Sequence, residues 1–424
     1  PQRTTERADT SPRPPERTGS LETTVERTAP EGDVDFSYGY THGRPSGNLV
    51  VDGEGRLPLS GPLDVALGGE PVWVVGVPFR EGVAWVVALR DGSIRDFYQD
   101  VPGGIDPLEV TPDRLPPGAP PLVRVGGGSL EIVPGSPLTH PLPVDGALVG
   151  VEEDGDVYLE DGGSRASTNA SAPPDARIVK SESGTVAFLS SPTERYAHGV
   201  LGDAIEAAGI TMAEIGENDA PEVLTEIVPE SGGVFESISP LWFEAPGEGE
   251  LLAVSESADG VGSRVSVYSP DGRLAAAGPF IGEPFKWRHV LAAGPFGQNG
   301  ELEVAAVRTP HLDAVVEFYR PEFETGTLEI VAEVPGYASH RLDTRNLDTA
   351  RAGDLDDDGS WELLVPNRTY TELAAIRRTP DGAEVEWALP VGGETRTNIA
   401  SATDPEGRAA VAVGRSDGAL RIWR

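Results

Sequence analysis

The sequence predicts an all-β chain, a seven-bladed β-propeller with four strands in each blade, and three observations support this. The chain has 52 glycines and 39 prolines among 424 residues, which suits many short strands joined by tight turns. A unit of apolar strand, polar loop ending in glycine and second apolar strand recurs about every 50 residues. Asp-Gly pairs separate alternating strands, a strong hairpin signal. Recurrence of this length, built from strands alone, is typical of a propeller with one four-stranded sheet in each repeat.

The repeat is marked by a glycine at the end of each polar loop. The intervals between these glycines range from 46 residues (82 to 128) to 65 residues (184 to 249). The seven glycines are Gly82, Gly128, Gly184, Gly249, Gly300, Gly359 and Gly407.

Two later repeats divide into four strands each, with Asp271-Gly272 and Asp381-Gly382 as their last turns. In the fourth repeat we expect strands at Leu241–Glu244, Leu251–Ser255, Arg264–Tyr268 and Arg273–Ala277. In the sixth we expect them at Ala350–Gly353, Trp361–Val365, Leu373–Arg378 and Ala383–Leu389.

The seventh repeat has only three candidate strands, Ile399–Ala402, Ala409–Val413 and Ala419–Trp423, before the sequence stops. An open sheet edge favours unwanted pairing, so a ring needs a fourth strand here. We expect an N-terminal strand near residues 48–59 (Asn48–Val51 or Arg56–Leu59) to supply it, within a propeller that covers residues 36–424.

The N-terminal residues 1–35 are expected to be a disordered tether or linker. Residues 1–30 are rich in Thr, Arg, Glu and Pro and have almost no large apolar side chain. Such a segment cannot bury enough apolar surface to offset the entropy lost on ordering.

The third repeat contains an irregular insertion that is the best candidate for a ligand-binding site. It gathers Arg195, Tyr196, His198 and Asp203, and its end, toward residue 209, is the one segment expected to form a short helix. Loops held by a rigid scaffold commonly carry function. These four side chains suit a sugar or an acidic ligand. The alternative is that Tyr196 and His198 pack the core while Arg195 pairs locally.

The most distinctive stretch is an acidic loop that runs into the apolar Leu363–Val365. Asp354, Asp356 and Asp358 alternate, and Gly359 can adopt the backbone angles of a tight turn. The carbonyl of Ser360 and the carboxylate of Glu362 would add further oxygens. An oxygen-rich, carboxylate-containing shell is what Ca²⁺ prefers. The alternative is a solvated acidic turn before a strand.

The motif Asp-x-Asp-x-Asp-Gly-x-x-Glu at Asp354–Glu362, followed by Leu-Leu-Val, resembles the FG-GAP/VCBS repeat of integrin-type propellers. The match is specific over about one repeat. The resemblance implies a seven-bladed propeller, Ca²⁺ as cofactor in acidic loops, and an exported or surface-exposed binding role. The loops before Gly300 and Gly407 lack several of the acidic positions, so one calcium site is expected.

Composition excludes several classes of function. The formal net charge of -36 disfavours a nucleic-acid partner, and the absence of cysteine rules out disulfides and thiolate metal sites. No apolar run is long enough to span a membrane. The remaining histidines show no metal-ligand spacing, so zinc is not expected; they are His42, His140, His289, His311 and His340.

The combined expectation is an exported, non-catalytic binding or assembly module that presents a propeller face to a protein or glycan partner. The location would be extracytoplasmic: secreted, periplasmic or at the cell surface. One alternative is a polysaccharide lyase or glycoside hydrolase with its site in the central funnel, using Arg195, Tyr196 and His198. The other is an accessory subunit of a cell-surface complex, reached through the N-terminal tether.

Overall fold

The computed structural model describes residues 36–40, 56–57, 61–101, 103–110, 112–144, 146–215 and 221–424. Within these ranges the chain forms 32 strands and no helix, which confirms the all-β prediction. None of the described residues belongs to a helix long and apolar enough to cross a membrane. The tether expected at residues 1–35 lies outside the described residues.

The described strands fall into eight consecutive sets, and most sets are four-stranded antiparallel sheets. The first set is β3 (Pro71–Phe79), β4 (Gly82–Leu89), β5 (Ile94–Gln99) and β6 (Ile105–Pro107). The second pairs β7 (Leu122–Gly126) and β8 (Ser129–Val133) with β1 (Phe36–Tyr38). The third is β9 (Leu142–Val144), β10 (Ala147–Val151), β11 (Asp156–Asp161) and β12 (Ser164–Ser171).

The next three sets join into one larger sheet through β17 (Val234–Phe235) and a single parallel pair between β21 and β25. The fourth set is β13 (Val179–Lys180), β14 (Val186–Thr193), β15 (Glu206–Ile215) and β16 (Pro221–Ile227). The fifth is β18 (Leu241–Ala245), β19 (Gly249–Ala258), β20 (Gly262–Tyr268) and β21 (Leu274–Ala277). The sixth is β22 (Arg288–Gly294), β23 (Glu303–Arg308), β24 (Val315–Glu322) and β25 (Thr327–Pro335).

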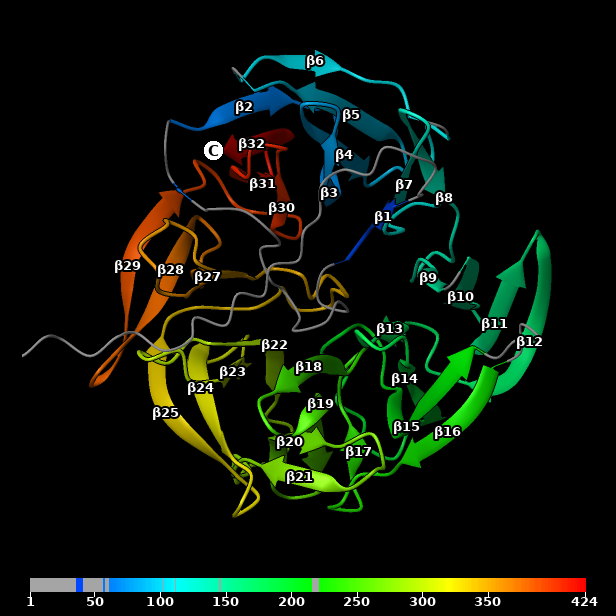
Figure 1. Ribbon diagram of the computed structural model, residues 1–424, viewed down its shortest axis with the longest axis vertical. Coiled ribbons are helices and arrows are strands. Elements are labelled where there is room, and N and C mark those ends of the chain that lie inside the picture. Colours follow the sequence, from blue (N-terminus) through cyan, green and yellow to red (C-terminus); the bar gives the residue numbers. More distant parts are fainter. Residues whose placement is uncertain are drawn as a thin grey trace, which may run out of the picture.

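The last two sets are again separate four-stranded sheets. The seventh is β26 (Arg351–Gly353), β27 (Glu362–Pro366), β28 (Glu372–Thr379) and β29 (Gly382–Pro390). The eighth is β30 (Ala400–Thr403), β31 (Ala409–Gly414), β32 (Ala419–Trp423) and β2 (Leu63–Ala66). Figure 1 shows the sets arranged around a common centre, with β2 beside β32.

The expected number of seven blades is not confirmed, because the described strands form eight sets. The additional set is the third, whose first loop ends at Gly146, only 18 residues after Gly128 (146 minus 128). The second set is correspondingly short, because it draws just two consecutive strands from this part of the chain and a third from β1. A repeat of about 50 residues therefore predicts one blade where the structure has two sets, the second and the third.

The apolar core lies between neighbouring sets. The second strands β4, β23, β27 and β31 are buried along nearly their whole length, as expected for strands covered on both faces. One cluster joins the first set to the eighth, for example Val74 and Trp85 with Ala410 and Leu420. Others join the first to the second, the third through the fifth, the fifth to the sixth, the sixth to the seventh and the seventh to the eighth.

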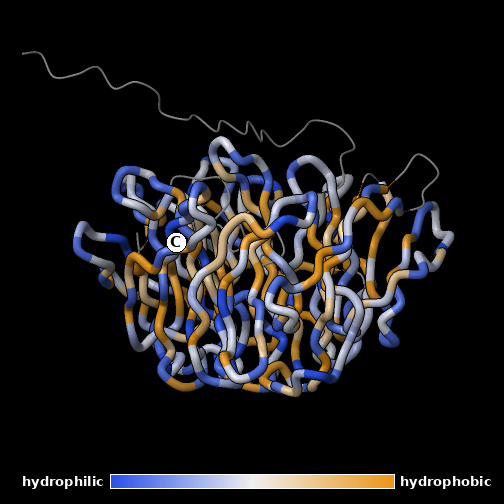
Figure 2. Tube along the Cα trace, turned by 90° about the horizontal axis from the view of Figure 1, so that it is seen from below, coloured by the Kyte–Doolittle hydropathy of each residue, from blue (hydrophilic) through white to orange (hydrophobic). Residues whose placement is uncertain are grey.

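The connections between strands lie at two opposite edges of the molecule (Figure 2). Because successive strands are antiparallel, the loops after first and third strands emerge at one edge, and those after second and fourth strands at the other. The β26–β27 loop and the β28–β29 turn share the first edge. The β14–β15, β21–β22, β23–β24 and β25–β26 connections share the second.

The strand that completes the eighth set is Leu63–Ala66, which pairs with Ala419–Trp423. This position corrects the expected strand near residues 48–59. Asn48–Val51 lies outside the described residues, and Arg56 and Leu57 form no strand. Leu57 instead donates its main-chain N–H to the carbonyl of Leu355, 2.8 Å away. Among the described N-terminal residues, Leu63–Ala66 are those that lie alongside β32 in antiparallel register.

The short helix expected toward residue 209 does not form, because Glu206–Ile215 is strand β15. Its residues pair with β14 on one side and with β16 on the other. The Ala-Ile-Glu-Ala-Ala segment has good helix formers, but central sheet pairing outweighs this weak preference.

The contact between the N-terminal strand β2 and β32 gives the first prediction. Asp64 accepts hydrogen bonds from Arg421 at 2.7 and 2.6 Å and from Arg415 at 2.9 Å. We expect Asp64→Ala to lower the free energy of unfolding by about 1 kcal/mol, since the Asp64 side chain is partly exposed. Urea denaturation measures this. Asp106→Ala, at an exposed position on β6, is the control, and equal stability of Asp64→Ala and the parent would contradict the prediction.

Candidate functional site

The acidic loop between β26 and β27 is folded around its own carboxylates. The N–H of Asp358 lies 3.2 Å from an oxygen of Asp354 and 3.2 Å from one of Asp356, and the N–H of Gly359 lies 3.0 Å from Asp354. Asp357 and Gly359 have left-handed backbones, with φ of 64° and 86°. Ser360 donates its N–H to Asp358 at 2.8 Å. Alternating aspartates therefore close a tight loop, and their remaining oxygens converge.

Two overlapping groups of carboxylates meet at this loop. Oxygens of Asp354, Asp356 and Glu362 lie within 4.8 Å of one another, and so do oxygens of Asp356, Asp358 and Glu386. Four of these residues were predicted from the sequence. Glu386 was not, because it lies on β29 and reaches the loop only through the pairing of β28 with β29.

Glu362 is the group that most favours a bound cation. Its side chain is fully buried, Oε2 accepts the N–H of Leu355 at 2.9 Å, and Oε1 has no hydrogen-bond partner. Burial raises the pKa of Glu362 to about 8, with the neighbouring aspartates adding to the effect. A buried oxygen without a partner costs about 1–3 kcal/mol. A cation bound by Asp354, Asp356 and Glu362 would remove this cost.

The second group of carboxylates is already partly neutralised. Arg377 contacts Asp358 at 3.0 Å and Glu386 at 2.7 Å. The indole N–H of Trp387 donates to Asp356 at 3.0 Å. The first group is therefore the better cation site, and its all-oxygen ligands suit Ca²⁺. The carbonyl of Ser360 stays a predicted ligand.

Removing calcium should test this site. We expect a chelator to lower the melting temperature of the parent by roughly 5 °C relative to a calcium concentration about 100 times Kd, since a ligand stabilises the state that binds it. The Asp354→Ala/Asp356→Ala variant should melt at one temperature with or without chelator. Scanning calorimetry gives the answer, with Asp381→Ala on the same edge as the control. Equal chelator sensitivity in the parent and the double variant would exclude the site.

The raised pKa of Glu362 gives a pH prediction for the metal-free protein. A carboxyl whose pKa rises from 4.5 unfolded to about 8 folded binds more protons when folded, so its contribution to stability is complete below 4.5 and is lost as the pH rises through 8. We expect Glu362→Gln to remove this loss. Urea denaturation in chelator across that range measures it, and an unchanged pH slope in the variant would contradict the prediction.

The predicted ligand-binding residues of the β14–β15 connection are only partly brought together. Tyr196 is buried, and its hydroxyl accepts the N–H of Phe285 at 3.2 Å. Nδ1 of His198 contacts Glu236. Arg195 instead donates to the carbonyl of Gly233, the residue before β17.

The carboxylate of Asp203 contacts an arginine, and not the partners of Tyr196 and His198. It accepts a hydrogen bond from Arg345 at 2.5 Å, and Arg345 also contacts Asp175 at 2.7 Å. The nearby carboxyl of Glu206 is almost fully buried. Burial raises the pKa of Glu206 well above its usual value, and the carboxylates of Glu236, Asp175 and Asp203 raise it further.

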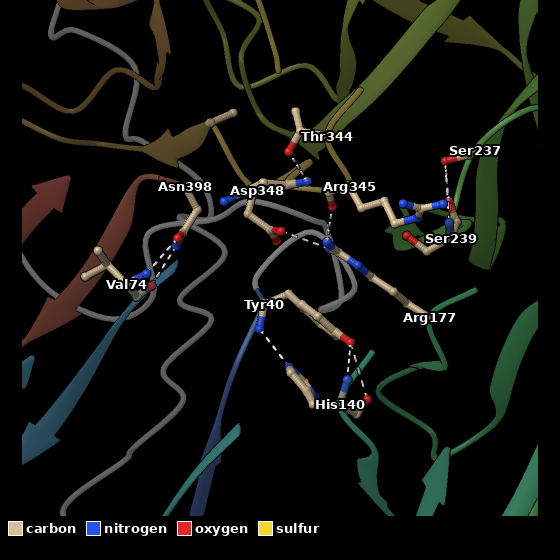
Figure 3. Close-up of polar contacts among 12 residues, drawn as sticks. Tyr40, Val74, His140, Arg177, Ser237, Ser239, Thr344, Arg345, Asp348 and Asn398 are labelled. Atoms are coloured by element: carbon tan, nitrogen blue, oxygen red, sulfur yellow. Dashed lines mark hydrogen bonds and ion pairs between the residues drawn. The ribbon is translucent and has the colours of Figure 1, made fainter. Parts of the chain in front are cut away.

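Paired charges fill the centre next to these residues. Figure 3 shows Arg177 with its guanidinium against Asp348, at 2.9 Å, and against the main-chain oxygen of Arg345. The same guanidinium lies 3.9 Å from the centre of the Tyr40 ring, which stacks on His140 at 3.6 Å. The buried charges of Arg177 and Asp348 therefore neutralise each other, as burial requires.

Three of the histidines that show no metal-ligand spacing in the sequence lie together at the second edge. Nε2 of His311 lies 3.0 Å from Nε2 of His340. The His340 ring packs edge-on to His289, with 5.5 Å between centroids, and His289 stacks on Trp287. Spacing along the chain gave no sign of this, because the three residues come from the β23–β24 loop, the β25–β26 connection and β22. His198 is close enough to lower the pKa of His311, and we call His198, His289, His311 and His340 the histidine cluster.

Burial and mutual repulsion lower the pKa of two members of the histidine cluster, His340 and His311. Burial lowers the pKa of His340 well below its usual value, and His311 lowers it further. Burial also lowers the pKa of His311, with His198 adding to the effect and Asp343 opposing it.

The same edge contains several non-glycine residues with left-handed backbones. This conformation costs of order 1–3 kcal/mol for each residue and is often found at functional sites. The residues and their φ angles are Phe285 (53°), Thr309 (46°), Ala314 (52°), Asp343 (56°) and Tyr370 (58°).

Comparison with known proteins identifies no family. No protein-family model matches the chain, and no curated protein matches it. Among solved structures it is similar to the computationally designed Ika8 protein, with 11% identity, a TM-score of 0.46, and coverage of 84% of this chain and 98% of the designed one.

Proposed function

We propose that this protein is an exported, calcium-stabilised β-propeller that binds a protein partner through the edge with the histidine cluster. In this proposal the strand sets close into a ring through β2 and β32. The pairing of Leu63–Ala66 with Ala419–Trp423 supports closure, as does the core shared by the first and eighth sets. The FG-GAP/VCBS resemblance, the calcium ion and the extracytoplasmic location belong to the same proposal.

The observation that carries the proposal is a set of exposed apolar side chains on this edge. Phe285, Leu312 and Leu342 are 50, 50 and 57% exposed, and they are three of the seven large apolar side chains exposed among the described residues. Such side chains at the surface are typical of interaction sites when they gather. Most large apolar groups elsewhere in the described chain are buried.

Contacts between the loops place these three residues around one region. The Phe285 ring lies 5.2 Å from the Tyr196 ring and 5.7 Å from the His198 ring. Leu312 follows His311 directly, and Leu342 lies two residues after His340, the partner of His311. The N–H of Asp343 donates to the carbonyl of Val200 at 3.1 Å, which ties the β25–β26 connection to the β14–β15 connection.

These side chains favour a protein over a glycan as the partner. Two of the three are leucines, whose branched aliphatic groups gain from burial in an apolar protein surface. A glycan binds better to a surface with an accessible flat aromatic ring and several free hydrogen-bonding groups. Near Phe285, the Tyr196 hydroxyl and the His198 Nδ1 already have partners.

The enzyme alternative has less support from the geometry. Arg195 contacts Gly233, Tyr196 is buried with a pKa raised to about 12 by burial, and His198 is held by Glu236. A lyase or glycoside hydrolase needs an acid and a base that converge on one substrate position. The rings of Tyr196 and His198 pack edge-on with 6.3 Å between centroids, but Arg195 makes its contact at Gly233 instead, and the polar atoms of Tyr196 and His198 already have partners.

Site-specific crosslinking should identify the partner. A photoactivatable residue at Leu342 is expected to crosslink to one defined protein in the cells that produce this chain. The same residue at Val223, which is exposed on β16, should give no such product.

Binding of the purified partner should then depend on the apolar side chains. We expect Phe285→Ala/Leu342→Ser to weaken it at least tenfold, since aromatic anchors often contribute 2 kcal/mol or more. The control variant Val223→Ser/Leu224→Ser should bind the partner as tightly as the parent does. Equally tight binding by Phe285→Ala/Leu342→Ser would contradict the proposal. If the chain bound a glycan on an array and this binding required Phe285, the partner would be a glycan and not a protein. If it cleaved an acidic polysaccharide and this activity required His198, the protein would be an enzyme.

A further inference from the structure

We infer that His311 and His340 form a binding site for a divalent transition-metal ion such as Zn²⁺, with Nε2 of each imidazole as a ligand. The inference starts from the 3.0 Å separation of these two nitrogens. Imidazole nitrogen is a common ligand of Zn²⁺, Cu²⁺ and Ni²⁺. This site differs from the acidic loop in ligand chemistry, and it lies at the opposite edge of the molecule.

The distance fits a shared metal ion with a small adjustment. Two nitrogens bound tetrahedrally to zinc at about 2.0–2.1 Å lie about 3.3 Å apart. Moving apart by a few tenths of an ångström is small for His311, because its side chain is partly exposed and sits in a loop. The adjustment leaves His340 where it is.

The surroundings orient His340 for this role. Its ring is fully buried, its Nδ1 lies 3.3 Å from the hydroxyl of Ser339, and Trp287 packs at 5.1 Å between ring centroids. An Nδ1–H directed at this hydroxyl leaves the Nε2 lone pair toward His311. Metal-binding histidines are commonly fixed in this way through their other nitrogen.

Without metal, the close nitrogens are explained by a hydrogen bond between two neutral imidazoles. In that state Nε2–H of His311 donates to Nε2 of His340. Metal binding needs the lone pair of both Nε2 atoms, so His311 moves its proton from Nε2 to Nδ1. The exchange releases no net proton, and it replaces one hydrogen bond with two metal–nitrogen bonds.

A metal ion at this pair needs ligands beyond the two imidazoles. Among the described residues, no third His, Asp or Glu offers an atom within 4.8 Å of both imidazole nitrogens, so two protein ligands are in place. Asp343 is exposed and follows His340 by three residues, and its carboxylate is close enough to raise the pKa of His311. Rotation of Asp343 or binding of water would complete the coordination. A site with open positions is typical of zinc that binds a further ligand.

Zinc titration of the full chain tests the inference directly, and it does not depend on the proposed partner. Isothermal titration calorimetry is run with ZnCl₂ in buffer containing saturating calcium, so that the acidic loop is occupied. We expect one zinc ion to bind for each chain. His311→Ala should weaken binding at least about tenfold, because one of two protein ligands is lost. His311→Asp, which keeps a ligand, should recover part of the affinity.

Two controls separate the histidine pair from other sites. Asp354→Ala/Asp356→Ala should bind zinc as the parent does, because the acidic loop is not involved. Co²⁺ should give a visible absorption band with the parent and not with His311→Ala, a readout that a purely structural histidine would not produce. No saturable zinc binding by the parent, or equal binding by the parent and His311→Ala, would overturn the inference.

Discussion

The structure depends on one constraint: the inner strands of most sets are apolar on both faces, so these sets need a neighbour on both sides. Strands such as β4 and β31 are buried along their length and cannot face solvent on either side. Face-to-face packing around a common centre meets this need, and the eighth set packs on the first. The strands then run between two edges, and irregular backbone is confined to those edges. Both candidate sites therefore lie at those edges, in loops and at strands beside them.

The two edges have different chemistry for a physical reason. At one edge a short connection between paired strands brings carboxylates into a single tight loop, which suits a hard cation. At the other edge long connections from several sets run inward and meet. Their charged groups are buried and must be paired, as in Arg177 with Asp348 and Arg345 with Asp175. Imidazoles and apolar side chains occupy the rest of this edge, with Phe285 and Leu342 exposed.

The sequence predicted individual strands and turns well and the number of sets less well. The four strands expected in the fourth and sixth repeats agree with β18–β21 and β26–β29 to within a few residues, because Asp-Gly turns and apolar runs are local signals. The second set has no local signature of its own, since its third strand is the distant segment Phe36–Tyr38. The strand that completes the eighth set also comes from far along the chain. This strand lies at Leu63–Ala66 because these residues pair in register with β32, and the spacing of the repeats along the sequence does not determine that register.

The sequence by itself determined the acidic loop. Asp354, Asp356, Asp358 and Glu362 lie within nine residues, and the turn at Gly359 brings oxygens of Asp354, Asp356 and Glu362 within 4.8 Å of one another. Only the tertiary structure decided the rest of both sites. Glu386 joins the loop through strand pairing, and His311 and His340 meet because two separate connections emerge at one edge. A short motif folds on itself, so its geometry can be read from the chain. A contact between distant residues is set by how the sheets pack and has no local pattern.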